Sequence, residues 1–193
     1  MKTKFDFKIL IADDDEIVRD AISSLLKDEG YSVISAKDGI DAIKILRVED
    51  IDLVITDLRM PGVDGYEVLR YSVKNNPDTV VVILTAYGTL DTALNAIKDG
   101  AYDYLTKPFK IQEIILLAEK IYRRAQLIQE NRELKKSLRD AYRDIQLIKT
   151  VVRSNSPDLT AAWIEKIENL KASNIITHQD AEILKERLIR GNE

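Results

Sequence analysis

The chain has 193 residues, of which 45% are hydrophobic and 32% charged, so it can hold one domain with an extension or two small domains. It has no cysteine and one histidine, which excludes a disulfide scaffold, a thiolate zinc site and a histidine metal cluster. The net charge is −7 over residues 1–120, +5 over 121–153 and −2 over 154–193, which indicates an acidic front and a basic middle with different roles. Apolar runs are too short to span a membrane and no signal peptide is recognisable, so we expect a soluble cytoplasmic protein.

Two periodicities alternate along the front of the chain. Short apolar runs predict strands, and the segments between them, with apolar residues three and four apart, predict helices. This alternation predicts an α/β fold with a five-stranded doubly wound parallel sheet. The expected strands are 8–12, 31–36, 51–56, 79–84 and 102–105, and the helices between them are 15–28, 39–48, 64–74 and 89–99.

Polar side chains follow the strands of this predicted sheet. Asp13 and Asp14 come directly after the first strand and Asp57 after the third, and these strands are neighbours in the doubly wound order. Clustered carboxylates raise one another's pKa unless a cation neutralises them, and oxygen ligands without histidine or cysteine favour Mg²⁺. Thr85 follows the fourth strand and Lys107 the fifth. A hydroxyl, an ammonium group and a cation around one carboxylate can hold a phosphoryl group, with Asp57 as its acceptor.

Lys107-Pro108 opens a last helix that continues far beyond the sheet, because residues 111–153 contain no proline and no glycine. Its apolar positions alternate at four- and three-residue steps, which is the pattern of a coiled-coil seam. Asparagine and β-branched residues at a positions favour a parallel two-stranded coil, so we expect a homodimer. A long amphipathic helix packed on its own domain is the alternative. The seam has Asn131, Leu138, Ile145 and Val152 at a and Leu127, Leu134, Ala141 and Ile148 at d.

A small helical hairpin is predicted after the long helix. Residues 154–158 break the helix, and helical spacing resumes over 158–172 and 179–190. Thr177 and Asp180 resemble a capping box at the start of the second helix. A hairpin of this size is too small for a strong core of its own.

Four stretches at the strand ends resemble the receiver domain of bacterial two-component response regulators, in detail the nitrogen-regulatory activator class. This resemblance covers residues 5–122 and implies a flavodoxin-like receiver over 1–122. The periodicity of the remaining chain predicts a coiled-coil linker helix over 123–153 and a helical hairpin over 154–193. The hairpin resembles the short C-terminal (SHOCT-like) helical hairpins found at the ends of many bacterial proteins, which implies oligomerisation or docking. The receiver-like stretches are Ile9–Asp15, Ile55–Gly65, Ile83–Ala86 and Gly100–Phe109.

The receiver resemblance assigns roles to the acids at the strand ends. Asp57 would accept a phosphoryl group from a phosphohistidine on a sensor histidine kinase. Mg²⁺, or Mn²⁺, would be held by Asp14, Asp57 and the backbone carbonyl of Arg59, with Asp13 acting directly or through water. The only chemistry implied is Mg²⁺-dependent self-phosphotransfer and autodephosphorylation.

The resemblance also implies a phosphoryl-binding set and a switch. Thr85, Ala86 and Lys107 would bind the phosphoryl group. Thr85 and Tyr104 would form the switch, in which the hydroxyl moves toward the phosphoryl group and the ring turns inward with it.

Three hypotheses for the output follow. Receivers of this class usually precede an ATPase and a DNA-binding domain, but the sequence has no phosphate-binding glycine loop and its tail is acidic. We therefore favour output by protein–protein interaction or dimerisation, with a downstream protein partner and no nucleic acid. A DNA- or RNA-binding tail is the second hypothesis. The third is a phosphatase with Asp57 as nucleophile, although Arg59 stands where dehalogenase-type enzymes carry a second acid.

Overall fold

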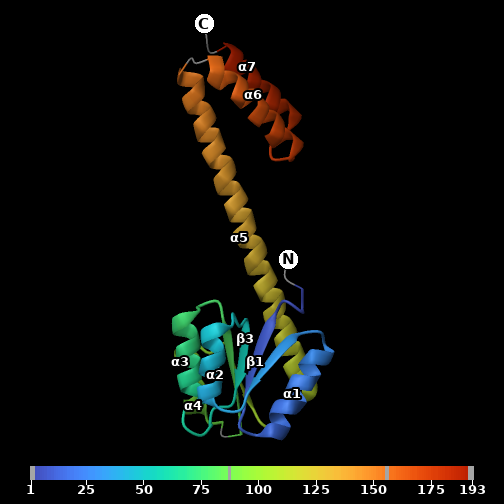
Figure 1. The fold of residues 1–193 in the computed structure, drawn as a ribbon, viewed down its shortest axis with the longest axis vertical. Coiled ribbons are helices and arrows are strands. Elements are labelled where there is room, and N and C mark those ends of the chain that lie inside the picture. Colours follow the sequence, from blue (N-terminus) through green and yellow to red (C-terminus); the bar gives the residue numbers. More distant parts are fainter. Residues whose placement is uncertain (1–2, 87, 155–156, 191–193) are drawn as a thin grey trace. The chain divides into compact units, whose positions relative to one another are not determined.

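The computed structural model describes the backbone of residues 3–86, 88–154 and 157–190, and the side chains of 3–86, 88–147 and 161–186. The chain divides into two compact units, residues 1–129 and 130–193. In the first unit five parallel strands form one sheet in the order β2-β1-β3-β4-β5 (Figure 1). This order confirms the predicted doubly wound α/β fold. The long helix and the two further helices predicted after the sheet are also present.

Each predicted element is present, with boundaries that differ by a few residues. The last helix of the sheet unit begins at Ile111, three residues after Pro108, because the Lys110 backbone N–H bonds the Glu113 carboxylate at 3.1 Å and caps the helix there. The elements are β1 (Lys8–Ala12), α1 (Glu16–Asp28), β2 (Ser32–Ala36), α2 (Gly39–Val48), β3 (Leu53–Thr56), α3 (Gly65–Asn75), β4 (Val80–Thr85), α4 (Leu90–Lys98), β5 (Asp103–Thr106), α5 (Ile111–Ser154), α6 (Pro157–Ala172) and α7 (His178–Arg190).

Alternate residues of the central strands feed two separate cores. Ile9 and Ile11 of β1 face a core closed by α1 and α5, while Leu10 and Ala12 face a core closed by α2, α3 and α4. Strands buried on both faces read as continuous apolar runs, which is why β1, β3 and β4 could be located from sequence. Because both faces of these strands are packed, the polar residues that follow them are gathered at one edge of the sheet.

Polar caps set the boundaries of the helices around the sheet. The carboxylates of Asp15, Asp38 and Asp64 accept hydrogen bonds from the first-turn N–H groups of α1, α2 and α3. Gly30 ends α1 with a φ of 91°, a conformation that glycine adopts without strain. The acid that begins α1 is therefore Asp15, and Asp13 and Asp14 are left to the loop between strand and helix.

The second unit contains the end of α5 and the pair α6 and α7. Trp163 and Ile167 of α6 pack with Ala181 of α7 in a small core. Thr177 and Asp180 exchange the hydrogen bonds of a capping box, as predicted, with the Asp180 N–H donating to the Thr177 hydroxyl at 3.1 Å. Within the part of the chain that the structure describes, no helix is long and apolar enough to cross a membrane.

Three aromatic rings pack edge to face where α5 leaves the sheet. Phe7, Tyr31 and Tyr122 have ring centroids 5.5–6.0 Å apart. Tyr31 is 3% exposed, and its hydroxyl has no hydrogen-bond partner among the described residues. Burial, together with the nearby Glu119 carboxylate, raises the pKa of the Tyr31 phenol to about 12.

We expect Tyr31→Phe to increase the free energy of unfolding by about 1 kcal/mol at neutral pH, because it removes a buried hydroxyl without removing ring contacts. Above pH 10 the unfolded chain ionises Tyr31 while the folded chain keeps it protonated, so wild-type stability falls as the pH rises toward 12. The Tyr31→Phe variant has no phenol at this position, so its free energy of unfolding does not fall with pH for this reason. Urea unfolding at pH 7 and pH 10.5 measures both effects. A less stable variant at pH 7 would mean that the hydroxyl has a bound water as partner.

Candidate functional site

The structure brings Asp13 and Asp57 together at the carboxyl edge of the sheet. The Asp57 backbone N–H bonds the carbonyl of Ala12 at 2.7 Å, so the residue after β3 is held directly beside the end of β1. Both carboxylates are nearly buried, at 2% exposure for Asp13 and 6% for Asp57. Two carboxylates in such a position need a nearby cation, because isolated buried charge is very costly.

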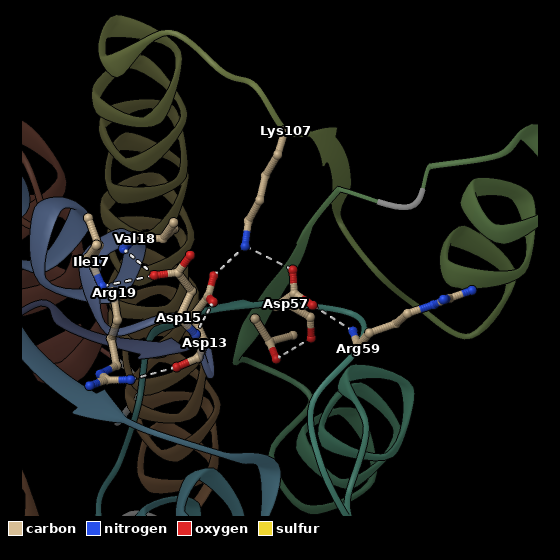
Figure 2. Close-up of polar contacts among 9 residues, drawn as sticks. Asp13, Asp15, Ile17, Val18, Arg19, Asp57, Arg59 and Lys107 are labelled. Carbon is tan, nitrogen blue, oxygen red and sulfur yellow. Dashed lines mark hydrogen bonds and ion pairs between the residues drawn. The ribbon is translucent and has the colours of Figure 1, made fainter.

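Lys107 supplies that cation from the residue after β5. Its Nζ lies 2.6 Å from Asp13 Oδ2 and 3.0 Å from Asp57 Oδ1, and Figure 2 shows the ammonium between the two carboxylates. We call Asp13, Asp57 and Lys107 the acidic site. The sequence predicted that these three residues meet, and the structure places them in direct contact.

The pKa values at this site show how burial and pairing compete. Burial raises the pKa of the Asp13 carboxyl, and its hydrogen bond to Lys107 offsets this only in part. Burial lowers the pKa of the Lys107 ammonium, but hydrogen bonds to Asp13 and Asp57 outweigh it and hold the pKa above its usual range. The ammonium therefore remains charged, while negative charge on two carboxylates is left incompletely balanced.

Asp14 follows Asp13 directly in the chain, and Arg59 lies two residues after Asp57. Both are exposed and line a hollow of about 510 Å³ that also borders Met60 and Tyr66. The Arg59 backbone N–H donates to Asp57 Oδ2 at 2.6 Å, which orients the carboxylate. Across the described residues, no three acidic, histidine or cysteine side chains come close enough to form a metal cage from protein groups alone. Mg²⁺ does not require such a cage, because it keeps several waters and binds one or two carboxylates.

The predicted switch residues lie on neighbouring strands: Thr85 is the last residue of β4, and Tyr104 is the second residue of β5. Thr85 is fully buried and Ala86 is exposed. The half-buried Tyr104 hydroxyl hydrogen-bonds the Thr92 hydroxyl of α4 at 2.9 Å, and the Tyr66 hydroxyl donates to the Thr92 carbonyl at 2.7 Å. Thr92 was not predicted as a functional residue, because its partners come from β5 and α3 and no local sequence pattern connects them.

Gly65 allows the start of α3 to pack closely against the backbone of Asp57 and Leu58. A Cβ at this first residue of α3 would lie 2.1 Å from the backbone carbonyl oxygen of Asp57 and 2.9 Å from the Cα of Leu58. Only glycine permits this approach. The Gly65 N–H also bonds the Leu58 carbonyl at 3.0 Å, so the loop is clamped against the backbone of the candidate acceptor.

Comparison with known proteins identifies this arrangement. A family model described as the response regulator receiver domain matches residues 9–119. The chain belongs to this receiver family. A receiver is a phosphorylation-controlled signalling domain and not a classical enzyme.

The receiver has relatives among nitrogen regulators. It is 39% identical over 134 residues to an NtrX-like response regulator of Rickettsia typhi and 34% identical over 129 residues to the nitrogen assimilation regulatory protein NtrX of Azorhizobium caulinodans. These matches cover 68% and 66% of this chain but only 28% of each relative. The chain thus spans less than a third of the matched curated proteins, and the last helices of this chain are not identified by any of them.

Solved structures of receiver domains are similar to this chain in both sequence and fold. The receiver domain protein from Clostridium thermocellum is 35% identical with a TM-score of 0.59, covering 63% of this chain and 98% of that one. The receiver domain of NtrX from Brucella abortus is 36% identical with a TM-score of 0.56, covering 58% and 96%.

We expect Lys107→Met to lower the free energy of unfolding of this receiver by about 3 kcal/mol without divalent cations, because two nearly buried carboxylates lose their counter-charge. Added Mg²⁺ should recover at least half of the loss by restoring positive charge. Urea unfolding with chelator and with Mg²⁺ measures this. Lys110→Met, at an exposed position, is the control and should change little. Equal stability of both variants in chelator would show that the carboxylates do not depend on Lys107.

Proposed function

We propose that this chain is a phosphorylation-controlled response regulator that accepts a phosphoryl group on Asp57 from a sensor histidine kinase. The single observation that carries the proposal is the Lys107 ammonium, 2.6 Å from Asp13 and 3.0 Å from Asp57 in a nearly buried site. A nearly buried acceptor carboxylate beside a fixed cation is suited to receive a group that brings further negative charge.

Several residues of the chain take part in the proposed transfer of the phosphoryl group to Asp57. A carboxylate oxygen of Asp57 attacks the phosphorus, an O–P bond forms, and the P–N bond to the donor imidazole breaks with the electron pair leaving on nitrogen. Lys107 neutralises charge on the equatorial oxygens. The Thr85 hydroxyl and the Ala86 backbone N–H would donate hydrogen bonds to the same oxygens.

The donor set suits Mg²⁺, or Mn²⁺. Asp14, Asp57 and the backbone carbonyl of Arg59 would hold the ion, with Asp13 acting directly or through water. All these donors are oxygens, which hard cations prefer, and the single Lys107 ammonium faces two nearly buried carboxylates. When bound, the ion neutralises phosphoryl charge and aligns the acceptor.

The proposed switch consists of Thr85 and Tyr104. In the present arrangement the Tyr104 hydroxyl is held 2.9 Å from the Thr92 hydroxyl on α4. If Thr85 moves toward the phosphoryl group, it vacates space for the Tyr104 ring to turn inward, and the bond to Thr92 breaks. The phosphoryl charge would thus be transmitted to α4 as a shift between two populations.

We propose an output through residues 123–153 as a linker coil, with residues 154–193 as a hairpin for docking. Three leucines of the predicted seam, Leu127, Leu134 and Leu138, are exposed at 60%, 68% and 58%, whereas the side chains of the seam residues Ile148 and Val152 lie outside the described residues. A second copy of this chain would cover these leucines. In a parallel pair Glu130 at g faces Lys135 at e of the other helix, which favours the parallel homodimer.

Phosphoramidate with Mg²⁺ tests the proposal directly. Intact-mass spectrometry should show the gain of one phosphoryl group, and peptide mapping after borohydride reduction should place it on Asp57. Chelation of Mg²⁺ should abolish the gain. Absence of labelling at saturating phosphoramidate and Mg²⁺, or labelling elsewhere, would contradict the proposed acceptor.

A further inference from the structure

Arg19 of α1 contacts the acidic site from the side opposite Lys107. Its Nη1 donates to the backbone carbonyl of Asp13 at 2.9 Å, and Figure 2 shows Arg19 and Lys107 approaching opposite ends of Asp13. Arg19 is half-buried, although arginine on the outer helix of a sheet usually extends into water. A half-buried guanidinium aimed at one carbonyl suggests a specific task.

The Asp13 carbonyl lies just beyond the strand ladder. The paired register of β1 ends at Ala12, which matches Ala36 of β2 and Thr56 of β3. The Asp13 N–H still reaches the Ala36 carbonyl at 3.3 Å, but its own carbonyl oxygen points past the sheet. Arg19 supplies the donor that a neighbouring strand no longer provides, which a buried carbonyl needs.

Every polar atom of Asp13 is thereby used. Carboxylate Oδ1 accepts the Asp15 N–H at 3.0 Å and Oδ2 accepts Lys107 at 2.6 Å. Asp15 in turn accepts the first-turn N–H groups of α1 at Ile17 and Val18. The first turns of α1 therefore hold the Asp13 residue on both its backbone and its side chain.

We propose that Arg19 is a positioning residue that sets the direction of the Asp13 carboxylate toward the bound cation and Lys107. This inference rests on the proposed function of the acidic site. The guanidinium bonds the backbone carbonyl and neither carboxylate oxygen, of which Oδ1 accepts the Asp15 N–H and Oδ2 accepts Lys107, so Arg19 orients Asp13 without occupying a carboxylate oxygen that could bind the cation. Its fork-shaped, permanently charged group suits a fixed orientation better than the flexible ammonium of lysine does.

Mg²⁺ binding to the full chain, measured by isothermal titration calorimetry, tests this role. Residues that hold a metal ligand in place typically contribute about 10- to 100-fold in affinity, and a contact through the backbone belongs at the low end, so Arg19→Met should weaken Mg²⁺ binding about tenfold. Phosphorylation by phosphoramidate should recover at saturating Mg²⁺. Arg19→Lys should recover part of the affinity and serves as the folded test case if the methionine variant does not fold.

Arg47→Met is the matched control, because Arg47 lies in the last turn of α2, at the other end of the sheet, and the substitution removes the same charge. It should leave Mg²⁺ affinity unchanged. Unchanged affinity in a folded Arg19 variant, or equal weakening in Arg47→Met, would overturn the inference. If the wild-type chain bound no Mg²⁺ at all, the proposed function would fail first.

Discussion

We expect Asp57→Asn to lower the rate of phosphorylation by phosphoramidate at least a hundredfold, because a neutral amide oxygen is a poor nucleophile for phosphorus. The fold should survive. Lys107 keeps its 2.6 Å contact with Asp13, and the Arg59 N–H can donate to the amide oxygen as it does to the carboxylate. One nearly buried negative charge is removed, so unfolding in urea should require at least as much free energy as in the wild type.

A variant that loses phosphorylation but keeps its free energy of unfolding shows that Asp57 is the phosphoryl acceptor. Loss of a purely structural acid would lower the free energy of unfolding as well. Asp28→Asn, at the exposed last residue of α1, is the matched control and should be labelled like the wild type. Intact-mass time courses with equal phosphoramidate and Mg²⁺ measure the rates. Labelling of Asp57→Asn at more than a tenth of the wild-type rate would show that another residue accepts the phosphoryl group.

The fold was largely predictable because its signals are local. The strands β1, β3 and β4 are buried on both faces and appear as apolar runs, and Gly30, Asp64 and Asp180 mark helix ends by their own chemistry. The convergence of Asp13, Asp57 and Lys107 was also predictable. Parallel strands in a doubly wound order can end at only one edge, so residues that follow them must meet.

Contacts that depend on side-chain reach were not predictable. The sequence placed Lys107 near the acids but gave no reason to put its ammonium between two carboxylates rather than in solvent. Arg19 and Thr92 lie on helices with no motif of their own, and their partners are a carbonyl at the end of β1 and a hydroxyl on β5. Asp13 and Asp14 are adjacent and chemically identical, yet one is buried and the other exposed, because only the turn after β1 decides which side chain faces inward.

The predicted coiled-coil seam of α5 leads to a second prediction, which concerns the oligomeric state of the chain. A period of alternating three and four residues fits a packed seam, and the exposed leucines of α5 fit a partner that covers them, here a second copy of this chain. We expect the full chain without phosphoryl donor to sediment as a dimer. Leu134→Lys should raise the dimer dissociation constant about a thousandfold, because two buried leucines, worth about 2 kcal/mol each, are replaced by charges that must stay hydrated.

Glu133→Lys is the matched control for Leu134→Lys, because it introduces the same side chain one residue earlier, at a c position outside the seam. Sedimentation of this control should match the wild type. A dimeric Leu134→Lys chain would place the interface elsewhere, and a wild-type chain that stays monomeric at high concentration would refute the coil. Repeating the series with Mg²⁺ and beryllofluoride then separates two modes of output. If the dimer is unchanged, the coiled coil holds two receivers together in both states and does not itself respond to phosphorylation. If the mass changes, assembly is itself the response to phosphorylation of Asp57.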